Sequence, residues 1–330
     1  GLAGNAIHKI LGGRAGIAAH MEEPSWTRRT LLRRGKTAAT TATLVGLAGC
    51  SGVGSVVDGS PDSPYPATWL PAPDRVFASD TDPAQRWYPF RVRRFDELAT
   101  YLQDRGASFE STALYQDGKA HPVLDIEPSR AAMEIRAGGR GLSVLETDLL
   151  AEEIVEEFQT PESDEPIQKA FEPLGEYEGY RLFGAPDTDW VVGIKAGVVV
   201  EAFASMAPDP LGDKRAAVEA IIDARDGEGR YTATDETLAG VVRRLGTGMT
   251  VRAEPPGVEV ADADGEPTAS GTAHTSAETE NATRVLAFET REDAETFAAD
   301  PQSEQMRSWE DIAVSRDGRF VTITGTSHPA

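Results

Sequence analysis

Apolar and polar residues follow two different periods along the chain beyond residue 69. Apolar residues three and four apart are typical of amphipathic helices, and short apolar runs between turn residues are typical of strands. The first pattern predicts helices at Arg94–Asp104, Ser143–Phe158, Asp213–Ala224, Asp235–Leu245 and Arg291–Ala299. The second predicts strands at Trp87–Val92, Tyr180–Phe183, Trp190–Ile194, Val198–Phe203, Met249–Ala253 and Arg284–Glu289. A capping box at Ser143 and an N-cap at Thr290 support two of the helices.

Two hairpins are predicted, each around a central Asp-Gly that suits a tight turn. One is Phe109–Tyr115 with Ala120–Ile126, and the other is Asp311–Ser315 with Arg319–Thr324. In both places a strand and a helix come first, so the order strand, helix, hairpin occurs twice, which predicts an internal duplication. Helices and antiparallel hairpins in this proportion predict an α+β fold.

Two segments interrupt this pattern. Residues 50–68 are rich in Ser, Gly, Asp and Pro and bury too little apolar area to order themselves, so we interpret them as a flexible tether. Residues 258–282 are acidic and rich in Ala and Thr, and are interpreted as a linker or long loop. The chain is therefore predicted to have an α+β domain at 69–257 and a second strand-helix-hairpin unit at 283–330.

The N-terminal region has the pattern of an export signal. Arg28 and Arg29 are followed by an apolar run, residues 37–49, which is 13 residues long and shorter than the roughly 20 that span a bilayer. Thr27-Arg28-Arg29-Thr30-Leu31-Leu32 resembles the twin-arginine motif, whose pathway exports folded proteins. A signal beginning at Met21 would have ordinary length, so residues 1–20 are interpreted as upstream sequence and residues 21–49 as the signal peptide.

Leu47-Ala48-Gly49-Cys50 resembles a lipobox. That resemblance implies cleavage between Gly49 and Cys50 and a lipid on the Cys50 thiol. The alternative is that Cys50 is one small residue in an apolar tail. As Cys50 is the single cysteine, no disulfide within the chain is expected.

The charge of the chain is unevenly divided. Residues 1–50 contain seven Lys and Arg and two Asp and Glu, so the remainder holds 25 basic and 52 acidic side chains. An acidic surface poor in lysine is tolerated where salt screens self-repulsion, and with the export signal it resembles a lipoprotein of a salt-loving archaeon. An acidic mesophilic protein is the alternative. Nucleic acid is not an expected partner, because it is bound by basic patches, and Arg91, Arg93 and Arg94 are interpreted as a solvated edge.

Residues 180–253 are similar in the order of their elements to an uncharacterised family of extracytoplasmic proteins. That family has no assigned activity, so the resemblance implies architecture and location without a mechanism.

No catalytic motif is recognised. The chain has no Gly-x-Ser-x-Gly, phosphate loop or dinucleotide fingerprint, and no histidine spacing suited to zinc. A serine triad would have to use His121 or His274. Asp262–Glu266 offers oxygen ligands but departs from the calcium-loop pattern, so no metal or cofactor is expected. Asn281 begins a glycosylation sequon.

The sequence therefore favours a lipid-anchored module on the outer face of the cell membrane that binds an unknown surface ligand or protein. A carboxylate-dependent hydrolase and a structural envelope component are the alternatives. A cleft with two carboxylates of raised pKa would favour the hydrolase, a cleft lined by Trp and Tyr with few titrating groups would favour binding, and no cleft at all would favour the structural role. Aromatic side chains could line a binding cleft but are more often core anchors; they are Trp69, Trp87, Tyr88, Tyr180, Trp190 and Trp309.

Overall fold

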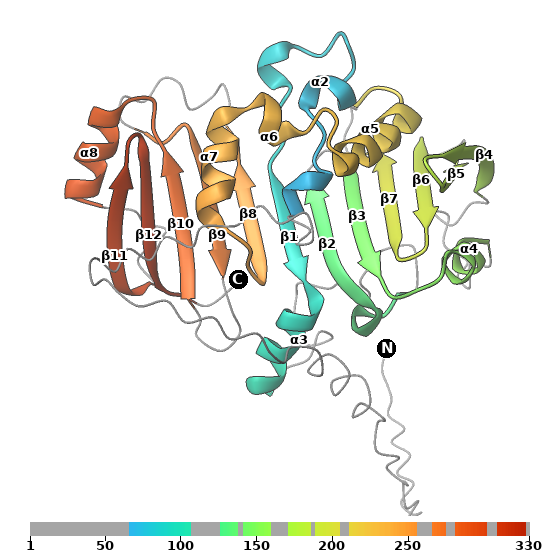
Figure 1. Cartoon of the computed structure of the whole chain (residues 1–330), viewed down its shortest axis with the longest axis horizontal. Coiled ribbons are helices and arrows are strands. Elements are labelled where there is room, and N and C mark those ends of the chain that lie inside the picture. The colour runs from blue at the N-terminus through green and yellow to red at the C-terminus, as the bar shows by residue number, and fades with distance from the viewer. Residues whose placement is uncertain are drawn as a thin grey trace, which may run out of the picture. The chain divides into compact units, whose positions relative to one another are not determined.

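The chain folds around one antiparallel sheet of 12 strands in this computed structural model, which describes residues 66–106, 126–137, 141–159, 171–185, 189–204, 211–255, 266–274, 281–301 and 309–327. The strand order is β11-β12-β10-β9-β8-β1-β2-β3-β7-β6-β5-β4 (Figure 1). Helices pack against the sheet, and the predicted α+β class is confirmed.

Every strand alternates its side chains between the two sheet faces. The strands are β1 (Phe90–Arg94), β2 (Ala131–Ala137), β3 (Leu142–Thr147), β4 (Glu172–Tyr177), β5 (Tyr180–Ala185), β6 (Trp190–Lys195), β7 (Val198–Phe203), β8 (Thr250–Glu254), β9 (Ala269–His274), β10 (Asn281–Ala287), β11 (Glu310–Asp317) and β12 (Phe320–Thr326). All neighbouring pairs are antiparallel.

Seven α-helices are found among the described residues: α2 (Pro73–Val76), α3 (Phe95–Asp104), α4 (Ala151–Gln159), α5 (Lys214–Asp226), α6 (Tyr231–Thr234), α7 (Glu236–Leu245) and α8 (Arg291–Ala299). Three short 3₁₀ turns accompany them, η1 (Pro66–Trp69), η2 (Pro83–Gln85) and η5 (Pro128–Arg130). No described helix is long and apolar enough to cross a membrane.

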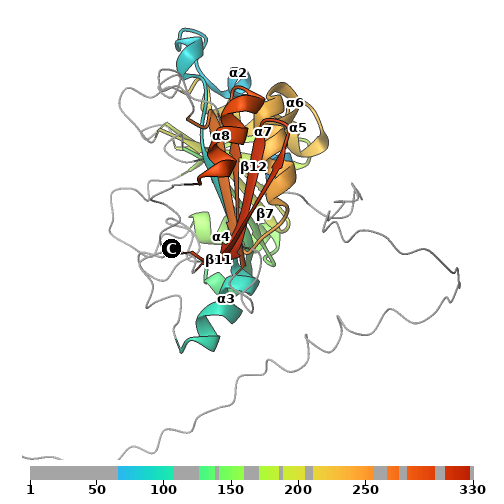
Figure 2. The ribbon, with the colours of Figure 1, turned by 90° about the vertical axis from the view of Figure 1, so that its left-hand side faces the viewer.

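Helices α5 and α7 lie on the same face of the sheet, which we call the helical face (Figure 2), α7 over β9 and β10 and α5 over β6 and β7 (Figure 1). Each helix buries an apolar stripe against alternate strand residues, for example Ile221 and Val241 against Val200 and Val285. Glycine at position 271 lets α7 approach β9 closely, because a Cβ there would lie 2.5 Å from Leu245 Cδ1. The main core of the protein lies between these helices and the sheet.

The opposite face of the sheet is apolar only at its two ends. At one end α8 packs over Leu286 and Ile323 of β10 and β12. At the other end α3 and α4 pack over strands β3, β7 and β6, with Phe95, Leu145 and Val199 in the shared core. The central strands of this face, β9, β8, β1 and β2, carry mostly polar side chains there.

The sheet contains the same strand arrangement twice. In each copy three consecutive strands are followed by a helix and a hairpin, and the hairpin pairs with the third strand. The first repeat is β1-β2-β3-α4-β6-β7, with β4 and β5 inserted, and the second is β8-β9-β10-α8-β11-β12. The repeats meet where β1 pairs with β8. A duplication was expected from the sequence, but the repeating unit differs, and the hairpin predicted at 109–126 lies almost wholly outside the described residues.

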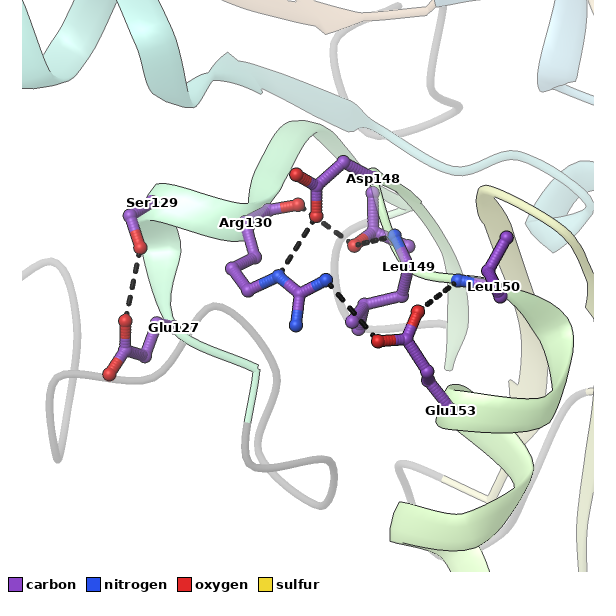
Figure 3. A network of polar contacts seen from close by, with 8 residues as sticks. Glu127, Ser129, Arg130, Asp148, Leu149, Leu150 and Glu153 are labelled. Carbon is purple, nitrogen blue, oxygen red and sulfur yellow. Dashed lines mark hydrogen bonds and ion pairs between the residues drawn. The ribbon is translucent and has the colours of Figure 1, made fainter. Parts of the chain in front are cut away.

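The predicted helix at Ser143–Phe158 is wrong in its first half. Residues 142–147 form β3, which pairs with β2 and β7, because both faces of this segment are buried: Val144 lies in the core under α5 and α7, and Leu145 in the core under α3 and α4. A strand satisfies this burial and an amphipathic helix does not. The helix begins at Ala151 instead. Polar contacts fix this junction: Arg130 binds Asp148 at 2.9 Å, and the Glu153 carboxylate accepts a hydrogen bond from the Leu150 amide (Figure 3).

The segment interpreted as a linker also contains regular structure. Ala269–His274 forms β9, a central strand of the sheet, and residues 283–326 continue the same sheet through β10. Small and polar residues dominate β9, so its sequence lacks the apolar run that predicts a strand. The other predicted helices, including the N-cap at Thr290, are confirmed, and strand boundaries move by a few residues.

Candidate functional site

Four arginines lie in one row across the middle of the sheet, on the face opposite α5 and α7. Arg252 of β8, Arg91 of β1 and Arg136 of β2 are direct cross-strand neighbours. Thr272 of β9 lies next to Arg252 and separates it from Arg284 of β10. We call Arg284, Arg252, Arg91 and Arg136 the arginine row. It spans five adjacent strands of the sheet.

The alternation of the central strands produces this row. Phe90–Val92 and Val251–Ala253 each place an arginine between two residues buried on the helical face, so the arginine points the other way. The sequence analysis interpreted Arg91, Arg93 and Arg94 as a solvated edge, and this interpretation is wrong. They occupy a central strand, and Arg93 is only 5% exposed.

The row concentrates positive charge in a very acidic protein. Adjacent strands are about 4.8 Å apart, and like charges directly opposite each other in a sheet repel. Carboxylates offset part of this repulsion. Arg252 donates a hydrogen bond to Glu254 at 2.5 Å, and Arg136 donates one to Glu134 at 2.5 Å.

Glu134 is the more deeply placed of these two carboxylates. It is 3% exposed, and its second oxygen lies 3.5 Å from the guanidinium of Arg93. A carboxylate between Arg136 and Arg93 thus offsets part of the positive charge on the first repeat's side of the sheet. Because a buried ion pair is costly to break, this network is expected to be rigid.

A cavity of about 180 Å³ opens at the other side, in the second repeat. Its lining residues come from the neighbouring strands β8, β9 and β10; they are Arg252, Glu254, Ser270, Gly271, Thr272 and Arg284. Most of its exposed wall is polar. We refer to it as the arginine cavity.

Arg284 gives the arginine cavity its chemical character. Its Nε atom is buried and has no hydrogen-bond partner. Burial lowers the pKa of the Arg284 guanidinium, because the charged form is desolvated, while nearby Glu254 acts to raise that pKa. A partly buried guanidinium binds a negatively charged oxygen strongly, so the site favours a ligand that supplies one to Arg284.

His274 lies in β9 on the same face, two residues beyond Thr272. Its Nδ1 atom is 3.0 Å from Thr250 Oγ1 on β8. Burial lowers the pKa of His274, so the neutral ring is favoured at this position. His274 is therefore a structural part of the polar face, whereas the sequence analysis considered it for a serine triad; His121, the other candidate, lies outside the described residues.

The export and anchor residues predicted from the sequence, Arg28, Arg29, Gly49 and Cys50, also lie outside the described residues. Asn281 is described. It is the exposed first residue of β10 and pairs with Thr326 of β12, so the sequon begins a strand of the sheet rather than standing in a linker.

The aromatic residues form no common cleft. Trp69, Tyr88 and Tyr180 are buried in the main core, whereas Trp190 belongs to the core under α3 and α4 and Trp309 packs beside α8. They are core anchors, which is the second of the two roles the sequence offered. Within the described segments, no group of three His, Cys, Asp or Glu side chains could hold a metal ion.

The arginine cavity could have been found in part from the sequence. The predicted strands Trp87–Val92 and Met249–Ala253 each carry one arginine between two apolar residues, Arg91 and Arg252. Two facts were missing, however: that these strands pair, and that ASGTAH at 269–274 is a strand between them and Arg284.

Comparisons with known proteins provide no guide to this site. No family model matches the chain, and no curated protein and no solved structure matches it.

Proposed function

We propose that this protein is a lipid-anchored binding protein on the outer face of the cell membrane, and that the arginine cavity binds a small anion. The observation that carries the proposal is the guanidinium-bearing side chain of Arg284, which lines the cavity and whose buried Nε has no hydrogen-bond partner. A protein with more than twice as many acidic as basic residues beyond position 50 nevertheless gathers arginines on one patch. Such a patch serves anion recognition better than it serves stability.

The physical argument concerns desolvation. A guanidinium that is already partly removed from water binds an oxyanion more strongly than an exposed one, because less solvation is lost and the local dielectric is lower. The strands that carry Arg252, Thr272 and Arg284 are hydrogen-bonded to one another, so their side chains start from a fixed framework. Preorganisation of this kind lowers the entropic cost of binding.

The location rests on residues outside the described part of the chain. Arg28 and Arg29 resemble a twin-arginine signal, and Cys50 in its lipobox would carry the lipid. The tether was expected at residues 50–68, but Pro66–Trp69 form η1 and Ala67 is buried, so the proposed tether ends before Pro66. The acidic, lysine-poor composition fits a salt-rich exterior.

The arrangement gives less support to the two alternatives. A hydrolase of the kind considered would place two carboxylates of raised pKa in one cleft. Burial raises the pKa of Glu97 on α3, but Glu97 does not line the arginine cavity. A purely structural envelope protein would have no use for a cavity with an unpartnered guanidinium.

Direct binding measurements test the proposal. The chain carrying Cys50→Ser, which cannot be lipidated, is titrated calorimetrically with acetate, chloride, sulfate and phosphate at constant pH. Binding of at least one anion, lost in Arg284→Gln and kept in Arg243→Gln, is expected. Arg243 is an exposed residue of α7 and provides the matched control. If no anion binds to the unsubstituted chain, the proposed function is wrong.

A further inference from the structure

The two repeats place different residues at equivalent positions of the polar face. Arg91 of β1 corresponds to Arg252 of β8, since these residues pair with each other where the repeats meet. On the next strand outward, Arg91 pairs with Arg136 of β2 and Arg252 pairs with Thr272 of β9. Glu134 and Ser270 each lie two residues before these partners, so they correspond to each other. The first repeat therefore has a carboxylate at the position where the second repeat has a short hydroxyl side chain and a cavity.

The polar face thus holds a carboxylate in the first repeat; the positions of its partners Arg136 and Arg93 are taken by Thr272 and Glu254 in the second repeat, where Arg284 supplies the cation instead. In the first repeat the Glu134 carboxylate lies 2.5 Å from Arg136 and 3.5 Å from Arg93. In the second repeat Ser270, Thr272 and Arg284 surround the corresponding space with two hydroxyls and a guanidinium. These are the donors that a carboxylate with two oxygens can engage together.

The charge on the cavity wall limits the ligand to a single negative charge. Two arginines and one glutamate line the cavity, and Arg252 is already bound to Glu254 at 2.5 Å. This leaves one guanidinium, that of Arg284, to be neutralised. A doubly charged phosphate or sulfate would meet the Glu254 carboxylate without a second cation to offset the repulsion.

Glu254 can also accept a hydrogen bond from the ligand. One of its oxygens, Oε1, accepts the hydrogen bond from Arg252, whereas Oε2 accepts none from the described residues. A hydroxyl or ammonium group close to the ligand's carboxylate would fill this role. About 180 Å³ accommodates several water molecules, and hence a small organic acid.

We propose that the arginine cavity binds a small monocarboxylate that carries a hydroxyl or ammonium group next to the carboxylate. This rests on the proposed anion-binding function and narrows its ligand class. The carboxylate bonds to the guanidinium of Arg284 and to the hydroxyls of Ser270 and Thr272. The neighbouring donor group bonds to Glu254.

The test compares five probes by calorimetry on the Cys50→Ser chain: 2-hydroxypropanoate, alanine, propanoate, sulfate and phosphate. We expect 2-hydroxypropanoate or alanine to bind at least about tenfold more tightly than propanoate, as one hydrogen bond to a carboxylate allows. Which of the two binds more tightly identifies the donor as hydroxyl or ammonium. Sulfate and phosphate are expected to bind more weakly than either.

Variants separate the contributions of the two cavity walls. Arg284→Gln should weaken the binding of the preferred probe by about tenfold or more, and Arg243→Gln should leave this affinity unchanged. In Glu254→Gln, 2-hydroxypropanoate and alanine should no longer bind more tightly than propanoate, and sulfate should bind more tightly than it does to the original chain. Its thermal unfolding is followed in parallel to show that the variant is folded.

The outcomes separate this inference from the proposed function. If sulfate or phosphate binds as tightly as the carboxylates, or if propanoate matches 2-hydroxypropanoate and alanine, the ligand class is wrong while anion binding stands. If the preference survives in Glu254→Gln, the role of Glu254 is wrong. If none of the five probes binds, both proposals fail together.

Discussion

Arg91 and Arg252 lie directly opposite each other on the two central strands of the sheet, at the point where the two repeats meet. Opposed like charges in a sheet are unfavourable by roughly 0.2–1 kcal/mol. A β-forming residue would be the more stable choice at either position. The arrangement is consistent with a site in which stability is given up for binding.

Replacing Arg252 by Thr tests this interpretation. The substitution removes the repulsion between Arg252 and Arg91. It also removes the ion pair with Glu254, in which the Arg252 side chain is 68% exposed and the Glu254 side chain 46% exposed. Exposed pairs contribute little, so we expect the free energy of unfolding to stay within about 1 kcal/mol of the original or to rise. Urea unfolding at low salt measures it, and a loss well above 1 kcal/mol would show that Arg252 is a structural residue.

Glu134 is predicted to be structurally essential, unlike Glu254. Glu134→Gln removes the carboxylate that lies 3.5 Å from the buried guanidinium of Arg93, which is expected to cost about 3 kcal/mol or more. Glu254→Gln, at an exposed carboxylate, should cost less than about 1 kcal/mol. Urea unfolding of both variants makes the comparison, and equal losses would contradict the assignment of separate roles.

His274 is predicted to make stability depend on pH. Its pKa is lowered in the folded state, so below the ordinary histidine value of 6.5 the unfolded chain binds the proton more readily than the folded chain. Stability should therefore fall as the pH drops below 6.5 and reach its full value above it. Urea unfolding at pH 5 and pH 7.5 is compared with the same measurement on His274→Gln, in which this part of the pH dependence should disappear. An unchanged pH dependence in the variant would assign it to other groups.

Gly271→Ala is predicted to destabilise the packing of α7. The new methyl group would lie 2.5 Å from Leu245 Cδ1 and 3.0 Å from the Arg252 carbonyl oxygen, so helix and strand must move apart. Overpacking of this kind costs about 1–3 kcal/mol. The neighbouring Ser270→Ala, which changes the other face, should cost less than about 0.5 kcal/mol by the same thermal or urea measurement. Similar losses for the two would mean that α7 adjusts freely.

The export prediction is tested separately from the folded body. Replacing both Arg28 and Arg29 by Lys keeps the charge but removes the motif that resembles a twin-arginine signal. We expect the mature form to disappear from the membrane fraction, as followed by immunoblotting. Mass spectrometry of the native protein should find a lipid on Cys50 as the first residue; an unmodified thiol behind an intact leader would refute the anchor.

Local signals in the sequence were enough for most helices and for the fold class. The caps and apolar spacing of residues 235–245 and 291–299 specify their helices without help from distant parts of the chain. Residues 142–147 show the limit of such signals: a capping-box pattern was present, yet burial on both faces made the segment a strand. Tertiary context outweighed a local preference there.

The candidate site could not be predicted from the sequence, for a different reason. Its residues come from β8, β9 and β10, and β9 was hidden by its small and polar composition. Only the pairing of these strands brings Arg252 and Arg284 to one cavity, and pairing between segments separated by loops has no local signature. An arginine in a strand pattern is visible in sequence, but its neighbours are not.

The junction of β1 with β8 has a consequence for how this protein can change. A chain with a single repeat would expose the edge of that strand. If two identical copies paired through this edge, they would form a symmetric dimer, and every substitution would appear in both halves of the sheet. Joining both repeats in one polypeptide removes that constraint. One half can keep a permanent internal carboxylate while the other specialises in capturing one from outside.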